Sequence, residues 1–332
     1  MNSFGRIFRV SIFGESHGPM VGITIDGCPA GLSLKEEDFT QDLERRKGGM
    51  QKGTTPRKED DRPIFTAGVF NDKTTGAPLT ILFENANTRS ADYEKQRAVP
   101  RPGHADFVAN KKFGGNEDFR GGGHFSGRLT VCLVAAGVVA KKILGNRINV
   151  QAQIIEIGGE ADVEKGLQKA IDAKDSVGGI VECRVSGLPV GIGEPFFDSV
   201  ESMIGHAAFA IPAVKGLEFG AGFSASRMFG SEHNDAIVSQ EGKTGTNHAG
   251  GVVGGITTGN ELVYRVAIKP TSSTPKEQES WNWETGQLEK FSVKGRHDLC
   301  IALRVPPVLE AVTAVVLADL MLLEQKYARV LA

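Results

Sequence analysis

Long glycine-rich segments separate the periodic parts of this chain and constrain its fold more than any other feature. They span residues 47–62, 86–123 and 215–259. Glycine accounts for 42 of 332 residues, without a collagen repeat or low-complexity run, and this exceeds the usual share of about 7%. Such glycines mark tight turns and close backbone approaches. Since loops beyond about 12–15 residues are usually functional or disordered, we expect the chemistry of this chain in these segments.

Between these segments the hydrophobic pattern predicts a mixture of strands and helices. A capping box of Ser33 and Glu36 predicts the start of a helix that ends near Arg46. The predicted strands lie at 6–13, 20–26, 64–70, 79–83, 148–157, 179–186 and 262–268, and further helices at 128–144, 161–173, 198–210 and for about 20 residues after Pro307.

The region 148–186 reads as a split β-α-β unit. No linker and no internal repeat divides the chain. We therefore predict one α+β domain over residues 1–332 with largely antiparallel sheets.

Charge and cysteine content exclude several classes of protein. The net charge of −2 argues against a general nucleic-acid or anionic-membrane binder. The longest apolar run, 131–140, is too short to span a bilayer, and Arg6 and Arg9 interrupt any signal peptide. The cysteines are far apart and read as reduced core residues of a cytoplasmic protein. No HxxxH or HExxH spacing occurs among the seven histidines, which disfavours a metal site.

Residues 14–18, GESHG, match the GxSxG pattern of a hydrolase nucleophile elbow. An elbow needs a strand, a sharp turn and then a helix, whereas a strand pattern follows here. A serine hydrolase that uses Ser16 therefore stays as the alternative function, and a turn that presents Ser16 and His17 to a ligand is favoured.

A basic loop at 45–62 concentrates arginine and lysine in a chain of nearly zero net charge. One reading is a solvated charged loop. The other is a mobile clamp on a small polyanion, because arginine offers paired donors to carboxylate or phosphate.

Two further segments suit a phosphorylated, flat ligand. Residues 120–128, RGGGHFSGR, run directly into the apolar helix, and free N–H groups at a helix start favour anions. Residues 269–274, KPTSST, place one lysine and four hydroxyls at the end of a strand. Near the C-terminus, Asp298 follows an arginine and a histidine and is a candidate base or orienting group. A tight turn, a hydroxyl-rich loop and a structural ion pair are the respective alternatives.

Seven motifs, taken together and in order, closely resemble the chorismate synthase family from about Phe4 to Leu323. They are GESHGPMVGITIDGCPAG, RPGHADF, RGGGHFSGRLTVCLVAAG, AIPAVKGLEFG, NHAGGVVGGI, IKPTSST and GRHD. The resemblance implies a β-α-β sandwich with helices between antiparallel sheets, assembled as a homotetramer. It also implies a carbon–oxygen lyase that converts 5-enolpyruvylshikimate 3-phosphate to chorismate and phosphate by 1,4-anti elimination. This is the last step of the shikimate pathway and serves aromatic amino acid biosynthesis.

The family requires reduced FMN although the reaction has no net redox change. The resemblance leaves open whether this protein reduces its own flavin, with NADPH as reductant, or depends on a separate reductase. By motif it assigns catalysis to His17, His104 and Asp298, and binding of the substrate to Ser16, Arg46 and Lys52. It places FMN on His124, Phe125, Ser126, Pro212, Ala213, Gly254, Lys269, Pro270, Thr271, Ser272, Ser273 and Arg296.

The basic loop departs from the family pattern. Many members have a PGxSR segment where this chain reads GGMQK, so that Gly48 and Lys52 replace the usual proline and arginine. Lysine keeps the charge but loses the two-pronged donor geometry of arginine. Many relatives also have Arg-Ser-Ser at positions 124–126.

Overall fold

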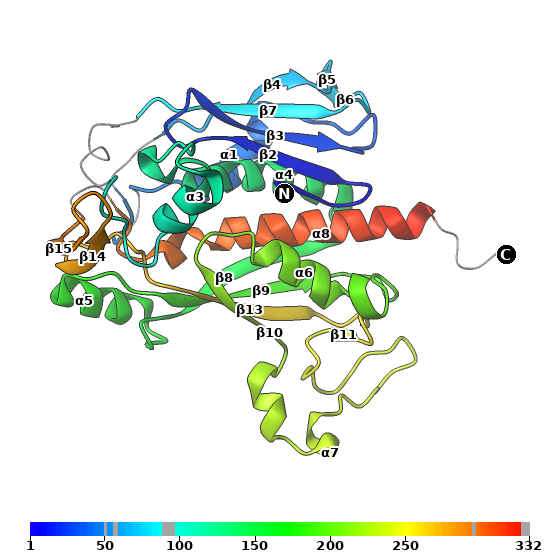
Figure 1. Ribbon diagram of the computed structural model, residues 1–332. Helices are drawn as coiled ribbons and strands as arrows, with labels where there is room; N and C mark the ends of the chain where they lie inside the picture. Colours follow the sequence, from blue (N-terminus) through cyan, green and yellow to red (C-terminus); the bar gives the residue numbers. More distant parts are fainter. Residues whose placement is uncertain (50–51, 56–58, 88–96, 294–296, 327–332) are drawn as a thin grey trace.

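Two antiparallel sheets enclose a helical layer in the computed structural model, which describes residues 1–49, 52–55, 59–87, 97–293 and 297–326 (Figure 1). The first sheet has the order β1-β2-β3-β7-β4 and the second β10-β13-β9-β8. The strands of the first sheet are β1 (Ser3–Phe4), β2 (Arg9–Gly14), β3 (Met20–Asp26), β7 (Leu79–Glu84) and β4 (Ile64–Ala67). Those of the second are β10 (Val214–Phe219), β13 (Leu262–Ile268), β9 (Gly179–Ser186) and β8 (Asn149–Ile157). The predicted α+β sandwich is confirmed.

The remaining elements connect and cover this sandwich. The α-helices are α1 (Thr40–Arg46), α3 (Asp106–Phe113), α4 (Thr130–Leu144), α5 (Val163–Ala173), α6 (Val200–Ala208), α7 (Gly230–His233) and α8 (Pro306–Lys326). Three short strand pairs are β5 (Val69–Phe70) with β6 (Lys73–Thr74), β11 (Val252–Val253) with β12 (Ile256–Thr257), and β14 (Gln278–Asn282) with β15 (Gln287–Phe291). The 3-10 helices are η1 (Glu36–Phe39), η2 (Arg120–Phe125), η3 (Gly127–Leu129), η4 (Phe196–Asp198), η5 (Gly222–Arg227) and η6 (Ile301–Arg304).

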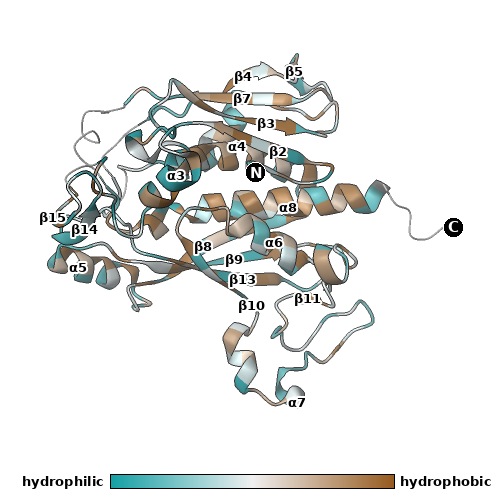
Figure 2. Cartoon of the chain, in the orientation of Figure 1, coloured by the Kyte–Doolittle hydropathy of each residue, from teal (hydrophilic) through white to brown (hydrophobic). Residues whose placement is uncertain are grey.

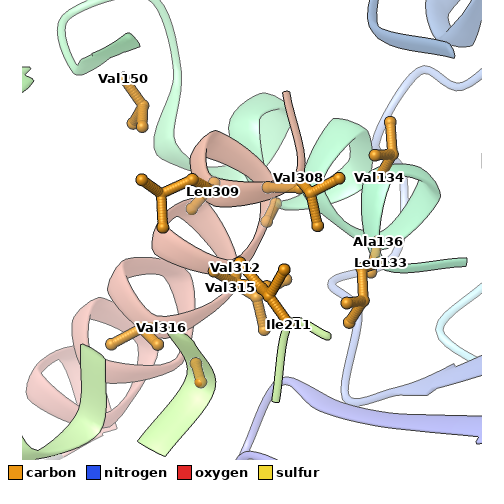
Figure 3. Packing of buried hydrophobic residues seen from close by; sticks show 14 of the residues in the cluster. Leu133, Val134, Ala136, Val150, Ile211, Val308, Leu309, Val312, Val315 and Val316 are labelled. Atoms are coloured by element: carbon orange, nitrogen blue, oxygen red, sulfur yellow. The ribbon is translucent and has the colours of Figure 1, made fainter. Parts of the chain in front are cut away.

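The first sheet packs on α4 and the second on α8, and most side chains of these two central helices are apolar and buried (Figure 2). They pack closely against each other at Gly137, where a Cβ atom would lie 2.3 Å from the Cβ of Ala311. Around this crossing, Leu133 on α4 and Val308 and Val312 on α8 are buried in the same core (Figure 3). Only a glycine permits such a close approach of two helix backbones.

Helix α8 is also long and apolar enough to cross a membrane by length and composition, over Pro306–Gln325. The prediction from apolar runs missed this segment because Glu310 and Asp319 interrupt it. In the structure 78% of that window is buried between the sheets, which is typical of a core helix.

Three buried polar side chains fix α8 to its surroundings. Asp319 accepts hydrogen bonds from the backbone N–H groups of Arg6, Ile7 and Phe8 at 2.7–3.1 Å, which orders the turn before β2. The hydroxyl of Thr313 lies 2.5 Å from that of Tyr264 on β13.

Glu310 joins α8 to α1, α4 and β8. It accepts two hydrogen bonds from Arg45, at 2.7 and 2.8 Å, one from Lys141 at 3.0 Å and one from the Ala152 N–H at 2.9 Å. Burial by itself raises the pKa of Glu310, but the Arg45 hydrogen bonds and the Lys141 charge outweigh it, so that the pKa lies below the ordinary 4.5.

Local structure differs from the predictions in three places. The capping box is wrong, because Ser33 pairs with Lys73 in an isolated β-bridge and the η1–α1 segment starts after Lys35, whose N–H donates to Asp38. The split β-α-β unit is wrong too, since β8 and β9 pair directly and antiparallel. Helix α3 lies within 86–123, which was predicted to be mostly irregular.

We expect Glu310→Gln to lower the free energy of unfolding at pH 7 by about 1.5–3 kcal/mol, the range for hydrogen bonds to a charged group. Because the folded-state pKa is depressed, the carboxylate stabilises the fold above pH 4.5 and loses this effect as the pH falls toward the folded value. Urea unfolding at several pH values should show the difference between parent and variant shrinking below about pH 4.5. The control is Glu279→Gln, at an exposed position of β14; an equal effect there would contradict the role of Glu310.

Candidate active site

Loops from distant parts of the sequence meet around a pocket of about 800 Å³. Its polar wall comes from 101–105, 121–128, 212–215, 269–273 and 297–298. Apolar side chains of α4 and α8, among them Leu133, Val308 and Val312, form the opposite wall. The volume is in the range of about 300–1,000 Å³ that small-molecule sites occupy.

Three consecutive glycines bring the two predicted catalytic histidines close to one backbone segment. Gly121, Gly122 and Gly123 have φ values of 60°, 83° and 52°, which L side chains rarely adopt. A Cβ atom on Gly121 would lie 2.4 Å from the ring of His17, and one on Gly122 would lie 3.2 Å from the ring of His104. The backbone of this turn therefore occupies the space between the two rings.

The GESHG segment forms the turn that joins β2 to β3, as the turn interpretation predicts. The N–H of Ser16 donates to the Gly123 carbonyl at 3.1 Å, and His124 Nδ1 lies 2.8 Å from the Gly14 carbonyl oxygen. These contacts hold the turn against the three glycines. Ser16 is fully buried, and its hydroxyl oxygen has no hydrogen-bond partner among the described residues.

His104 is held by two charged neighbours from its own loop. Its Nδ1 lies 2.5 Å from Asp106 Oδ1, and Arg101 donates to both carboxylate oxygens of Asp106 at 2.7 and 2.8 Å. Arg101 also donates to the Ser273 hydroxyl at 3.2 Å. Burial by itself raises the pKa of Asp106, but the hydrogen bonds from Arg101 and His104 outweigh it and place the pKa far below its usual value.

The segment 269–273 lines the same pocket. Lys269 Nζ donates to Ser272 at 2.8 Å, and Ser272 donates to the Gly103 carbonyl at 2.7 Å. Burial lowers the pKa of Lys269, and the charge of nearby Lys215 lowers it further. The buried Thr271 hydroxyl has no partner among the described residues, so a ligand would satisfy it.

His297 and Asp298 form another part of the pocket wall. Asp298 accepts the Thr55 N–H at 2.8 Å and Arg304 at 3.1 Å. Within the described residues, Nε2 of His297 is buried without a partner. Burial lowers the pKa of His297, and the charges of Arg101 and His104 act in the same direction.

Arg46 lies at the pocket but is buried, with 3% of its side chain exposed. It pairs with Asp61 at 3.1 Å, and the same carboxylate pairs with Arg128. It also donates to the carbonyls of Gly127 and Arg128, both at 3.1 Å. These bonds make its guanidinium a support for the start of α4 and leave it less suited to grip the substrate than we predicted.

The structure brings most of the predicted site residues together. Those that line the pocket are Arg46, His104, His124, Phe125, Ser126, Pro212, Ala213, Lys269, Pro270, Thr271, Ser272, Ser273 and Asp298. Ser16 and His17 lie behind Gly121, outside the lining.

Two predicted residues lie away from the pocket, and a third is not among the described residues. Lys52 is exposed and donates to Gln168 on α5 at 3.1 Å. Gly254 is exposed in the β11–β12 turn, away from the pocket lining. Arg296 lies outside the described residues, as do 50–51 and 56–58 of the loop predicted to be mobile.

Sequence reasoning gave no role to four charged or titratable residues that line the pocket: Arg101, His206, Lys215 and Arg304. Arg101 and Lys215 belong to the motifs RPGHAD and AIPAVKG, which was the available signal. His297, one of the glycine-flanked histidines expected to share a site with His17, His104 and His124, does line the pocket. Among the described residues no group of His, Cys, Asp or Glu could hold a metal ion.

A sequence model of the family described as chorismate synthase matches residues 8–322. The chain belongs to the chorismate synthase family.

Relatives and a solved structure agree with the chorismate synthase assignment over nearly the whole chain. The chorismate synthase of Chitinophaga pinensis is 72% identical and covers 99% of both chains. That of Methanocaldococcus jannaschii is 40% identical, covering 97% of this chain and 96% of its own. A crystal structure of chorismate synthase superposes with a TM-score of 0.73 at 26% identity, covering 98% of this chain and 94% of that one. The serine hydrolase alternative finds no support among these matches.

Gly121→Ala should abolish most chorismate synthase activity, because the new Cβ meets the His17 ring and the φ of 60° disfavours alanine. The matched control is Gly114→Ala, where φ is 63° but the nearest atom to the new Cβ is 3.7 Å away. Both variants share the backbone penalty of about 1–2 kcal/mol for an L residue at a left-handed φ, and Gly121→Ala adds the contact with the buried His17 ring. Urea unfolding should therefore show Gly121→Ala losing at least as much stability as Gly114→Ala, while activity separates them clearly. Full activity in Gly121→Ala would contradict this account.

Proposed function

We propose that this protein converts 5-enolpyruvylshikimate 3-phosphate to chorismate and phosphate by 1,4-anti elimination, with reduced FMN and without net redox change. The observation that carries the proposal is a single pocket that combines lysine and arginine side chains, His104 and unpartnered buried polar atoms. Membership in the chorismate synthase family supports the same reaction. It would be the last step of the shikimate pathway and serve aromatic amino acid biosynthesis.

The charges of the pocket suit a substrate with two carboxylates and a phosphate. Arg101, Lys215, Lys269 and Arg304 contribute side chains to the lining. Loss of the leaving group develops negative charge, and fixed cations stabilise that charge without reorganisation. The lowered pKa of Lys269 reflects partial burial beside Lys215, an arrangement that a bound anion would relieve.

The residues at one side of the pocket fit a phosphorylated, flat cofactor. Phe125 has 40% of its surface exposed and offers an aromatic face, while Thr271 has an unpartnered hydroxyl. Reduced FMN would lie on His124–Ser126, Pro212, Ala213 and Lys269–Ser273, and its bound form would supply electron density that assists cleavage of the C–O bond and then returns.

The two histidines would exchange protons near this site. His104 has its Nδ1 engaged by Asp106, which leaves Nε2 to exchange a proton with the leaving group or with the cofactor. His17 lies behind the glycine turn, so it would act on the ligands either through the backbone of that turn or after the turn has moved. Asp298, which accepts hydrogen bonds from Thr55 and Arg304, would assist removal of the substrate proton.

Assembly as a cytoplasmic homotetramer and use of NADPH as reductant belong to the same proposal. Exposed apolar side chains on the segment 220–250 favour a second copy of the chain as partner. They are Phe223, Phe229, Ile237 and Val238, each at least 66% exposed, and such gatherings mark association surfaces.

His17→Ala and His104→Ala should each lower turnover by about 10²- to 10⁴-fold, the contribution of a positioned acid or base. Chorismate formation would be followed anaerobically with dithionite-reduced FMN. His233→Ala, on α7 outside the pocket lining, is the control and should keep parental turnover. Near-parental turnover in both active-site variants would remove the assigned roles.

Reduced FMN should support many turnovers per molecule when oxygen is excluded, because substrate and products have the same oxidation level. The measurement counts chorismate formed per reduced flavin in a sealed cuvette while the flavin spectrum is recorded. Consumption of one reductant per chorismate would refute the proposal, as would full turnover with oxidised FMN alone.

A further inference from the structure

We propose that Asp106 and Arg101 are positioning residues that fix the tautomer of His104 and keep Nε2 free toward the pocket. The inference deepens the proposed function and rests on it for its activity readout only. It is based on the contacts around the imidazole ring of His104. The family resemblance assigned no role to Asp106 or Arg101.

The hydrogen-bond directions at Nδ1 follow from the charge of Asp106. Its lowered pKa means that the carboxylate is ionised at neutral pH and can only accept. Since Nδ1 lies 2.5 Å from Oδ1, the ring must donate there. The neutral ring then carries its proton on Nδ1 and presents the Nε2 lone pair.

Arg101 holds the carboxylate in this orientation. Its Nε donates to Oδ2 at 2.7 Å and its Nη2 to Oδ1 at 2.8 Å, while its backbone N–H reaches Oδ2 at 3.1 Å. The Nη2 atom also lies 3.1 Å from the imidazole Nδ1, but an Nδ1 that carries a proton and donates to Oδ1 cannot accept a hydrogen bond from it. Nη1 reaches Ser273, so that the ring orientation is tied to the segment 269–273.

The opposite edge of the ring lies beside Gly122, which has no side chain to cover it, and His104 lines the pocket. A Cβ on Gly122 would lie 3.3 Å from Nε2, so no side chain of this turn competes for that atom. Other charged or titratable groups near the ring are His297 across the pocket and Arg97, Glu117 and Asp118 around an adjoining cavity of about 40 Å³. Among the described residues, the carboxylate of Asp106 is the group that accepts a hydrogen bond from Nδ1.

Asp106→Ala removes the acceptor and should release the tautomer preference of the His104 ring. We would record ¹⁵N spectra of histidine-labelled protein without ligands and assign His104 with a His104→Gln sample. The parent should show a protonated Nδ1 in the neutral ring, and the variant should shift toward protonated Nε2. An unchanged tautomer in a folded variant would overturn the inference, and this result does not depend on the reaction catalysed.

Asp106→Asn removes the charge and introduces an amide group that can donate to Nδ1, and it covers the case in which the alanine variant fails to fold. It should shift the ring toward the tautomer protonated on Nε2, lower kcat by about 10²- to 10⁴-fold with KM nearly unchanged, and move the acid limb of the pH–kcat profile to lower pH. The control is Glu182→Gln, which loses a carboxylate paired with Arg184 and Arg265 outside the pocket. A parental profile and kcat in Asp106→Asn would refute the positioning role, whereas an inactive parent enzyme would refute the proposed function alone.

Discussion

The burial of α8 between two sheets is the constraint on which the rest of the molecule depends. Each sheet has one apolar face, and neither could cover the other directly while leaving room for a pocket of this size. The helix layer fills that space, and the close approach at Gly137 sets how near α4 and α8 can lie. Because α8 also supplies Val308 and Val312 to the pocket wall, the core and the site share one element.

Polar groups make this apolar layer specific. A uniformly apolar helix could slide or rotate between sheets with little loss of contact. Glu310, Thr313 and Asp319, in contrast, reach their hydrogen-bond partners when α8 lies in its observed position. The buried pairing of Asp61 with Arg46 and Arg128 does the same for the start of α4. Fixed helices then hold the loops of the pocket in place.

Periodicity predicted the elements that face the core, and it failed where burial does not set the pattern. Seven of the nine strands described in the two sheets were predicted from their apolar pattern, whereas β1 and β10 were not. Helices α4 and α8 were predicted as long apolar segments, one ending at Gly145 and the other beginning after Pro307. Helix α3 was missed since Phe107, Val108 and Phe113 are exposed and give it no apolar face. The capping box failed because a long-range bridge to Lys73 competes for Ser33.

The site was predictable as a set of motifs but not as a geometry. Motif order indicated which loops matter, whereas the burial of Arg46 and the outward direction of Lys52 depend on tertiary partners such as Asp61 and Gln168. Arg101 was overlooked because its importance comes from contacts with His104, Asp106 and Ser273 that no local spacing reveals.

The glycine turn between His17 and His104 also limits how this site can change during evolution. A side chain gained at position 121 would have to displace the His17 ring, and one at position 122 would press on the His104 ring at a φ that disfavours L residues, so that single substitutions there lead away from function. Exposed lining residues such as Phe125 and Lys215 have no such restriction. Substitutions that adapt the pocket to a new ligand shape can therefore occur at its rim, but not at the turn that separates the histidines.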